Sequence, residues 1–353
     1  MMDITSAGVD LAKEVFSVCA LDRAGRVLER RDLRREAFRA WFKRLPPGCV
    51  VGMEACGASH HWAREMRLLA LEPRIMAAEF VQPFRKSRAG KNDRNDAEAI
   101  AIAVREANMR FVAVKSIEQQ ARLARHRMRE GWKEERTALG NRIRGLLGEF
   151  GLAIPKSQAA LGKALVEALH DEGIPEPLRE LVRSTREHLE LLGKRIAQCD
   201  RAIGLACRHD PATKRLQELC GVGPTSADAA VATVGDARAF RNGRQFAAWL
   251  GLTPRQFSSG GKTRLGSITR RGDAYLRTLL VQGARSALKC AVRCAPERAS
   301  RLQQWIVQLH ARIGFQKTLV AIANKNARVI WALLAREDTY NPEAWKAYAH
   351  AKG

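Results

Sequence analysis

The feature that most constrains this chain is a row of apolar residues that repeats in alternating steps of four and three. The row consists of Leu178, Val182, Thr185, Leu189, Leu192, Ile196, Cys199, Ile203 and Ala206. This spacing places every member on one side of an α-helix and continues over about four heptads. We therefore expect one long helix in which a single apolar seam is covered by another helix.

A second, interrupted apolar stripe precedes the seam. Its members are Ile117, Ala121, Ala124, Met128, Leu139, Ile143 and Leu146, and the connection between the stripes holds Pro155, Gly173, Pro175 and Pro177. Two arrangements are open: an antiparallel hairpin in which the stripes cover each other, or a coiled coil between two chains. Residues 114–210 are predicted to form this helical, coiled-coil middle domain.

The N-terminal region, residues 1–113, has the pattern of an α/β domain. Strands are expected at 7–11, 15–21, 26–33, 49–54 and 74–78, and helices at 35–45 and 59–71. The sequence Asp22-Arg23-Ala24-Gly25 is a hairpin signal between the second and third strands. Strands that alternate with helices after an initial meander indicate a mixed α/β architecture.

The C-terminal region, residues 211–340, is predicted to be mainly helical, with a tail at 341–353. Gly221 and Gly223, in Gly221-Val222-Gly223-Pro224, precede an Ala-rich helix at 225–234. This arrangement suits a helix-hairpin-helix-like element whose glycines let the backbone approach a phosphate. An ordinary turn between helices is the alternative. Two further helices are expected within 299–335.

Charge indicates the class of partner. The chain has 61 Lys and Arg against 37 Asp and Glu, a net charge of +24, which favours nucleic acid. A membrane surface and the ribosome are competing explanations, but no run of 18 apolar residues predicts a membrane span. The N-terminus has no basic signal region, so we expect a cytoplasmic protein whose eight cysteines are reduced core thiols.

Four acidic residues form the first candidate site. Asp10 and Glu54 end predicted strands, and Asp93 and Asp96 are three residues apart at the start of a predicted helix. Strand ends are where open α/β sheets place active sites, and the spacing puts the aspartates on one helical face. Carboxylates hold the Mg²⁺ pair that phosphodiester displacement uses. The alternative roles are a turn for Asp10 and a helix cap for the aspartate pair.

A serine segment forms the second candidate site. Small residues in Ser258-Ser259-Gly260-Gly261-Lys262 suit close approach to a phosphate, and 255–289 holds eight Lys or Arg against one acid. The cations expected to contact nucleic acid are Lys262, Arg264, Arg270 and Arg271. The segment is a phosphate-binding loop or, if a serine is deprotonated, a nucleophile beside stabilising cations.

These motifs together resemble the DEDD transposases of bacterial insertion sequences, in the IS110 family and most closely its IS1111 branch. The matching pieces are Gly8-Val9-Asp10, Met53-Glu54-Ala55-Cys56-Gly57, Lys91-Asn92-Asp93-Arg94-Asn95-Asp96-Ala97, Gly221-Val222-Gly223-Pro224, Gly251-Leu252-Thr253-Pro254, the serine segment and Thr269-Arg270-Arg271-Gly272-Asp273. The resemblance covers nearly the whole chain in the right order, with no departure at the four acidic positions.

The resemblance implies more than the residues show by themselves. It implies an RNase H-like (RuvC-like) domain in which Asp10, Glu54, Asp93 and Asp96 bind Mg²⁺, with Mn²⁺ as an alternative. It implies a coiled coil and a transposase domain with a serine nucleophile, here Ser259, with Ser258 as the second choice. It also implies a noncoding guide RNA that pairs with donor and target DNA, and a dimer or tetramer whose subunits share the sites.

Three functions compete. The first is a bacterial DNA recombinase, acting at the nucleoid, that forms a serine–DNA intermediate. The second is a RuvC-like structure-specific endonuclease of the Holliday junction resolvase type, without a covalent intermediate. The third is a binding scaffold without catalysis. The serine segment favours the first, because a hydrolase that activates water needs no serine, and the complete acidic set argues against the scaffold.

Overall fold

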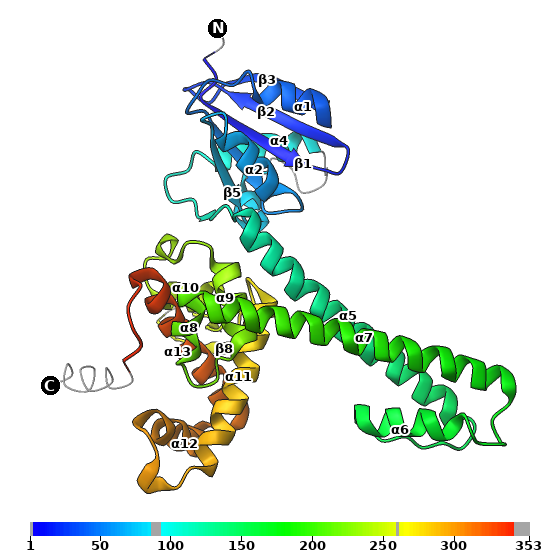
Figure 1. Ribbon diagram of the computed structural model, residues 1–353. Helices are drawn as coiled ribbons and strands as arrows, with labels where there is room; N and C mark the ends of the chain where they lie inside the picture. Colours follow the sequence, from blue (N-terminus) through cyan, green and yellow to red (C-terminus); the bar gives the residue numbers. More distant parts are fainter. Residues whose placement is uncertain (1–2, 86–92, 259–260, 342–353) are drawn as a thin grey trace. The chain divides into compact units, whose positions relative to one another are not determined.

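The computed structural model describes residues 3–85, 93–258 and 261–341, without the side chain of Asp93. The chain divides between Ile117 and Glu118 into two compact units (Figure 1). Ser259 and the tail residues 342–353 lie outside the described residues. The finer division at 113, 210 and 340 remains a prediction.

A mixed six-stranded sheet forms the centre of the first unit, in the order β3-β2-β1-β4-β5-β6. Its strands are β1 (Ser6–Leu11), β2 (Val15–Leu21), β3 (Val27–Arg34), β4 (Val50–Glu54), β5 (Glu72–Met76) and β6 (Phe111–Val112). Strands β1, β4 and β5 are parallel, and the remaining pairings are antiparallel. All five expected strands are present, the last one two residues earlier than predicted, and β6 was not expected.

The predicted turn between β2 and β3 is confirmed. The Gly25 amide donates to the Asp22 carbonyl at 3.1 Å, and the Asp22 amide donates to the Arg26 carbonyl at 3.0 Å. Gly25 has a φ of +86°, which a residue without Cβ adopts at little cost. The Asp22 carboxylate also accepts a hydrogen bond from the Arg26 amide at 2.8 Å, which closes the loop.

Helices lie against this sheet, and alternation along β1 separates its two faces. The helices are α1 (Arg35–Phe42), α2 (Ser59–Arg67), the short α3 (Ala78–Val81) with a 3₁₀ turn at Gln82–Phe84, and α4 (Asp93–Ala103). Ala7 and Val9 of β1 belong to the core that holds Phe38 and Trp62 of α1 and α2. The residue between them, Gly8, faces α4 instead.

Two glycines allow α4 to lie against the backbone of the sheet. Gly8 and Gly52 are partners in the β1–β4 pairing. A Cβ on Gly8 would lie 2.2 Å from the Ala97 carbonyl oxygen, and one on Gly52 would lie 2.9 Å from the Val104 Cβ. No larger residue fits at either position unless the helix moves. The close approach therefore determines where the first turn of α4 lies relative to the ends of β1 and β4.

We predict that Gly8→Ala destabilises the protein because the new methyl group overlaps the backbone of α4. The expected loss is about 1–3 kcal/mol in the free energy of unfolding, the usual range for overpacking. Urea denaturation measures it. The control is Gly57→Ala, where a Cβ meets no atom within 4 Å. Equal stabilities of the two variants would contradict the close packing of α4.

The second unit begins with three helices, α5 (Ile117–Gly148), α6 (Gln158–Ala168) and α7 (Glu176–His209). Figure 1 shows α5 and α7 side by side, and antiparallel contacts join them. Arg129 pairs with Asp200 at 2.6 Å, and Glu135 pairs with His188 at 2.9 Å. Helix α6, which the sequence did not predict, adds Leu161 and Leu165 to the apolar cluster at the far end.

The apolar seam of α7 is covered within the chain. Val182, Leu192, Ile196, Cys199 and Ile203 are all buried in the single protein molecule. Of the two arrangements left open by the sequence, the antiparallel hairpin is the one this structure contains. The seam therefore needs no second chain to cover it.

The rest of the second unit is mainly helical. Its helices are α8 (Pro211–Gln217), α9 (Pro224–Val234), α10 (Gly243–Trp249), α11 (Ala274–Arg293), α12 (Arg301–Ile313) and α13 (Phe315–Arg336). A small hairpin joins β7 (Pro254–Gln256) to β8 (Leu265–Ile268), and 3₁₀ turns lie at Ala237–Ala239 and Pro296–Arg298. In the described part of the chain, no helix is long and apolar enough to span a membrane.

Not all of the eight cysteines belong to the core. Cys56 and Cys290 are exposed, so the expectation of buried thiols is wrong for these two. Cys56 follows the end of β4, where the chain leaves the sheet and the core no longer covers it.

A buried charge network ties α5 to α9 and α11. Asp228 is fully buried, accepts a hydrogen bond from Arg122 Nε at 2.8 Å, and lies 2.8 Å from His126 Nε2. His126 Nδ1 lies 2.9 Å from the Tyr275 hydroxyl. Burial alone would raise the pKa of Asp228, but hydrogen bonds from His126 and Arg122 lower it below its usual value. The aspartate is therefore ionised in the folded protein.

We predict that Asp228→Asn destabilises the second unit by up to about 3–5 kcal/mol, because it removes the fully buried counter-charge of Arg122 and leaves only Asp210 to pair with that guanidinium. The folded-state pKa of Asp228 is lowered, so its contribution is present above the usual pKa of 3.8 and is lost as pH falls further. In urea denaturation, the deficit of the variant should shrink in acid. Asp236→Asn, which breaks an exposed pair with Arg238, should cost less than about 1 kcal/mol. Equal costs would contradict the network's role.

Candidate active site

Three of the four predicted acidic side chains are described, and they come from adjacent elements. Asp10 lies near the carboxyl end of β1, and Glu54 ends β4. Because β1 and β4 are parallel neighbours, these ends lie at the same edge of the sheet. Asp96 lies in the first turn of α4, which Asp93 begins. The side chain of Asp93 lies outside the described residues.

The carboxylates of Glu54 and Asp96 meet at one arginine. Arg85 Nη2 lies 3.1 Å from Glu54 Oε1, and Arg85 Nε lies 3.0 Å from Asp96 Oδ1. The Glu54 contact is also a hydrogen bond, whereas the Nε contact is an ion pair without hydrogen-bond geometry. The Asp96 side chain is only 8% exposed. Two acidic side chains, 42 residues apart in the sequence, thus face a common cation.

Asp10 belongs to the same cluster. Although Cys56 is exposed at the surface, the protein around its thiol displaces part of the water and raises the pKa of that thiol, and the negative charges of Asp10 and Glu54 raise it further. Both carboxylates therefore lie near this thiol. Among the described residues, no three His, Cys, Asp or Glu side chains are grouped as ligands of one metal ion.

A second ion pair holds the start of α4 against the sheet. Arg94 Nε donates to Asp32 Oδ2 at 2.7 Å, and the Ser17 hydroxyl donates to Asp32 Oδ1 at 2.7 Å. These hydrogen bonds, the Ser17 bond first, lower the pKa of Asp32. Arg94 therefore positions the helix turn that contains Asp96. The sequence does not indicate this role, because Arg94 is one of several basic residues in the same stretch.

The serine segment lies in the loop of the β7–β8 hairpin. Strand β7 pairs with β8 through Pro254 with Ile268 and Gln256 with Leu265. The exposed Ser258 hydroxyl accepts a hydrogen bond from Gln256 Nε2 at 2.9 Å. Ser259 lies outside the described residues, so its role remains a prediction.

The four predicted cations of this region are exposed, and close packing holds the base of the hairpin. The cations are Lys262, Arg264, Arg270 and Arg271. A Cβ on Gly272 would lie 1.9 Å from the Trp249 carbonyl oxygen, and one on Gly251 would lie 2.5 Å from the Arg271 amide nitrogen. Asp273 caps α11 by accepting from the Leu276 amide at 2.7 Å.

The two glycines before α9 differ in their surroundings. Gly221 has a φ of +86°, and a Cβ there would lie 2.5 Å from the Gly283 carbonyl oxygen of α11. The positive φ and the close packing against α11 are sufficient reasons for a glycine at this position, so no bound phosphate is needed to explain it. Gly223 is exposed, precedes the first residue of α9 and has open space where a Cβ would point. Of the pair, Gly223 is the one with room for a phosphate.

Comparisons with known proteins agree with this layout. A DEDD transposase model of the IS110 type matches residues 7–151, and the model described as "Transposase IS116/IS110/IS902 family" matches residues 213–300. The chain belongs to the IS110 family of DEDD transposases. Family membership implies an RNase H-like fold for the DEDD domain and an enzyme that cleaves DNA.

Curated relatives extend over nearly the whole chain. A probable family 20 transposase of Pseudomonas aeruginosa is 48% identical, over 97% of this chain and 100% of the relative. The transposase for insertion sequence element IS1111A of Coxiella burnetii is 38% identical, over 96% and 92%. The transposase for IS1328 of Yersinia enterocolitica is 32% identical, over 97% and 100%.

The acidic cluster of this family member fits a cation. Glu54 and Asp96 already direct carboxylate oxygens at a positive group, and oxygen is the donor that Mg²⁺ takes in proteins. Arg85 is in that sense a stand-in cation. The sequence does not single out Arg85, because it is the first member of a run of basic residues with nothing to distinguish it.

We predict that Arg85→Ala makes the first unit depend on divalent cations. Without Mg²⁺, the Glu54 and Asp96 carboxylates lose their counter-charge, so the melting temperature should fall. Added Mg²⁺ should raise it more than in the wild-type protein, because no guanidinium competes for the carboxylates. Differential scanning calorimetry in EDTA and in Mg²⁺ measures both effects. Arg74→Ala, at an exposed pair with Glu72, is the control. An equal Mg²⁺ response in Arg85→Ala and wild type would contradict competition for one site.

Proposed function

We propose that this transposase cuts and rejoins DNA through a Mg²⁺-dependent acidic site and a serine nucleophile. The acidic site comprises Asp10, Glu54, Asp93 and Asp96, and the nucleophile is Ser259. The observation that supports the proposal best is the meeting of Glu54 and Asp96 on one cation, with Asp10 close by. Acidic residues that converge at a sheet edge are suited to phosphodiester chemistry.

The four acidic residues would hold Mg²⁺, with Mn²⁺ as an alternative. When bound, such a cation lowers the pKa of a coordinated hydroxyl and neutralises developing charge on a phosphoryl oxygen. The chain itself positions the ligands, because the two glycines hold α4 on the sheet and Arg94 anchors its first turn. Arg85 keeps the carboxylates from repelling each other before the cation arrives.

In the proposed reaction, Ser259 Oγ forms a bond to the phosphorus of one DNA strand. The serine hydroxyl gives up its proton, the bond from phosphorus to the departing strand breaks, and the departing oxygen gains a proton and leaves as a hydroxyl. The exposed cations Lys262 and Arg264, in the same loop, would stabilise the charge on the phosphoryl oxygens. The covalent intermediate keeps the energy of one phosphodiester bond, which rejoining requires and hydrolysis would lose.

The alternative function is a RuvC-like structure-specific endonuclease without a covalent intermediate. The convergence of the acidic residues supports it equally, because that site lies within the first unit and includes no serine. The two functions differ in one product. Only the transposase links a DNA strand to the protein.

The proposed partners are donor DNA, target DNA and a noncoding guide RNA, as the family resemblance implies. The net charge of +24 suits such polyanions. We also propose a homo-oligomer, a dimer or a tetramer, in the bacterial cytoplasm. Three apolar residues of α7 outside its covered seam, Leu181, Leu191 and Leu205, are exposed and would be covered by a second copy.

We predict a covalent adduct between Ser259 and a DNA strand that forms only when the acidic site is intact. The protein is incubated with Mg²⁺ and a labelled element end, denatured, and examined for a protease-sensitive shifted band. The adduct should be absent from Ser259→Ala and from Asp10→Ala, because both sites act in one step. Both variants should still bind DNA, because Lys and Arg side chains that neither substitution changes supply the affinity.

Ser258→Ala is the matched control and should still form the adduct. Loss of the adduct in Ser258→Ala but not in Ser259→Ala would assign the nucleophile to Ser258. Strand cleavage without any adduct would contradict the transposase mechanism and favour the endonuclease.

A further inference from the structure

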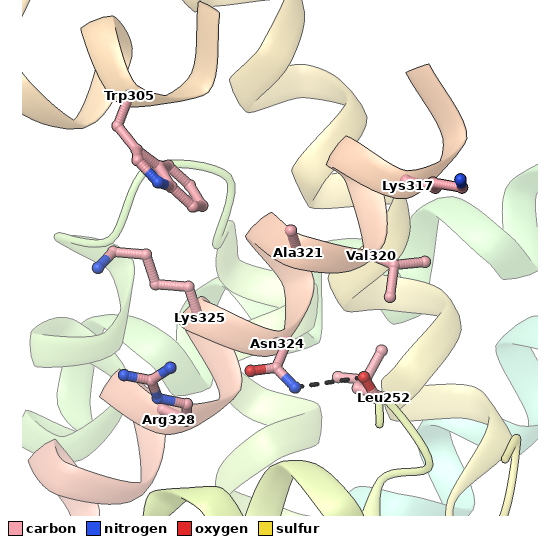
Figure 2. A pocket seen from close by; sticks show the side chains of 8 residues that line it. All are labelled: Leu252, Trp305, Lys317, Val320, Ala321, Asn324, Lys325 and Arg328. Atoms are coloured by element: carbon pink, nitrogen blue, oxygen red, sulfur yellow. Dashed lines mark hydrogen bonds between the residues drawn. The ribbon is translucent and has the colours of Figure 1, made fainter. Parts of the chain in front are cut away.

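A cavity of about 470 Å³ opens in the second unit beside α13 (Figure 2). Its lining includes Lys317, Asn324, Lys325 and Arg328 of α13, together with Trp305 of α12. The volume falls within the range of small-molecule sites, about 300–1,000 Å³. None of these residues belongs to the acidic cluster or to the serine segment.

The charge of the cavity indicates an anionic ligand. Three of its eight lining residues are cations, and none of the eight is acidic. Burial, together with the nearby charge of Arg328, lowers the pKa of Lys325 to about 8. A negative group placed between Lys325 and Arg328 would therefore stabilise both.

The Trp305 ring lines the cavity and indicates a ligand that has a flat apolar part as well as a negative charge. The Lys325 ammonium lies 5.6 Å from the centre of the Trp305 ring. Figure 2 shows Trp305, Lys325 and Arg328 on the same side of α13. An aromatic face beside cations is the combination by which proteins hold single-stranded nucleic acid, with stacking for the base and charge for the phosphate.

The cavity also lies beside the start of the β7–β8 hairpin, whose loop contains the serine segment. Asn324 Nδ2 donates to the Leu252 carbonyl oxygen at 3.2 Å (Figure 2), and Leu252 lies two residues before β7 begins at Pro254. Seven residues lead from Leu252 to Ser259, a reach of at most about 25 Å. A strand end near the serine therefore lies within a few nucleotides of the cavity.

We propose that this cavity binds one unpaired nucleotide of a nucleic-acid strand, with its phosphate at Lys325 and Arg328 and its base against Trp305. The proposal rests on the proposed function only in placing that strand near Ser259, since binding needs no cleavage. Single strands of DNA and of RNA both offer an unpaired base beside a phosphate. A duplex does not offer one, because its bases are paired and stacked inside the helix.

Binding of labelled oligonucleotides to the full chain in EDTA tests the proposal without cleavage. The probes are one sequence as single-stranded DNA, as single-stranded RNA and as duplex DNA, followed by fluorescence anisotropy. Trp305→Ala should weaken single-strand binding about fivefold to 100-fold, the effect of losing one base–aromatic stack, and should leave duplex binding unchanged. Trp305→Phe should restore most of it. Lys325→Met should weaken binding, whereas Lys214→Met, at an exposed cation of α8, should not do so selectively.

Crosslinking of the wild-type protein provides a readout that no folding defect affects. An oligonucleotide that contains 5-iodouracil is irradiated in the complex, and the modified peptides are identified by mass spectrometry. The tryptic peptide 302–312, whose only aromatic ring besides that of His310 is Trp305, should be labelled. Labelling by DNA alone identifies a strand of the element, and labelling by RNA alone identifies a guide strand.

Absence of that peptide from the crosslinked products would overturn the proposal, as would an equal loss of duplex binding in Trp305→Ala. A serine adduct without crosslinking at Trp305 would refute the cavity while sparing the proposed function. Crosslinking at Trp305 without a serine adduct would do the reverse.

Discussion

The close contact between α4 and the backbone of the sheet is the constraint on which the acidic site depends. Gly8 and Gly52 leave no room for a side chain, so the helix lies directly over β1 and β4. This packing brings Asp96 to the edge where β1 and β4 end. A site built on packed elements in this way holds its geometry more tightly than one built on loops.

The packing that forms the acidic site also has a cost, because it brings negatively charged side chains close together where they are partly buried. Arginine side chains of the same chain offset this repulsion. Arg85 bridges Glu54 and Asp96 in the first unit, and Arg122 pairs with the buried Asp228 in the second. The two differ in consequence. Asp228 is sealed in a core, whereas the Arg85 pairs lie at a sheet edge where another cation has access.

The sequence was sufficient to predict the features that depend on residues close together along the chain. Period-two alternation and the Asp22–Gly25 turn predicted the β-meander, and strand ends predicted the places of Asp10 and Glu54. Contacts between distant segments were beyond it. The α7 seam predicted a helix, yet only the fold shows that other helices of the same chain cover it. Arg85 looked like any member of a basic run, and the packing of Gly221 needs Gly283, which follows 62 residues later.

Crystals of the wild-type protein soaked in Mn²⁺, with diffraction recorded at the manganese absorption edge, test the central claim most directly. The account predicts an anomalous peak about 2.0–2.3 Å from carboxylate oxygens of Glu54 and Asp96, with the Arg85 guanidinium withdrawn from both. Arg85 still bridging the two carboxylates, with no peak between them, would contradict it.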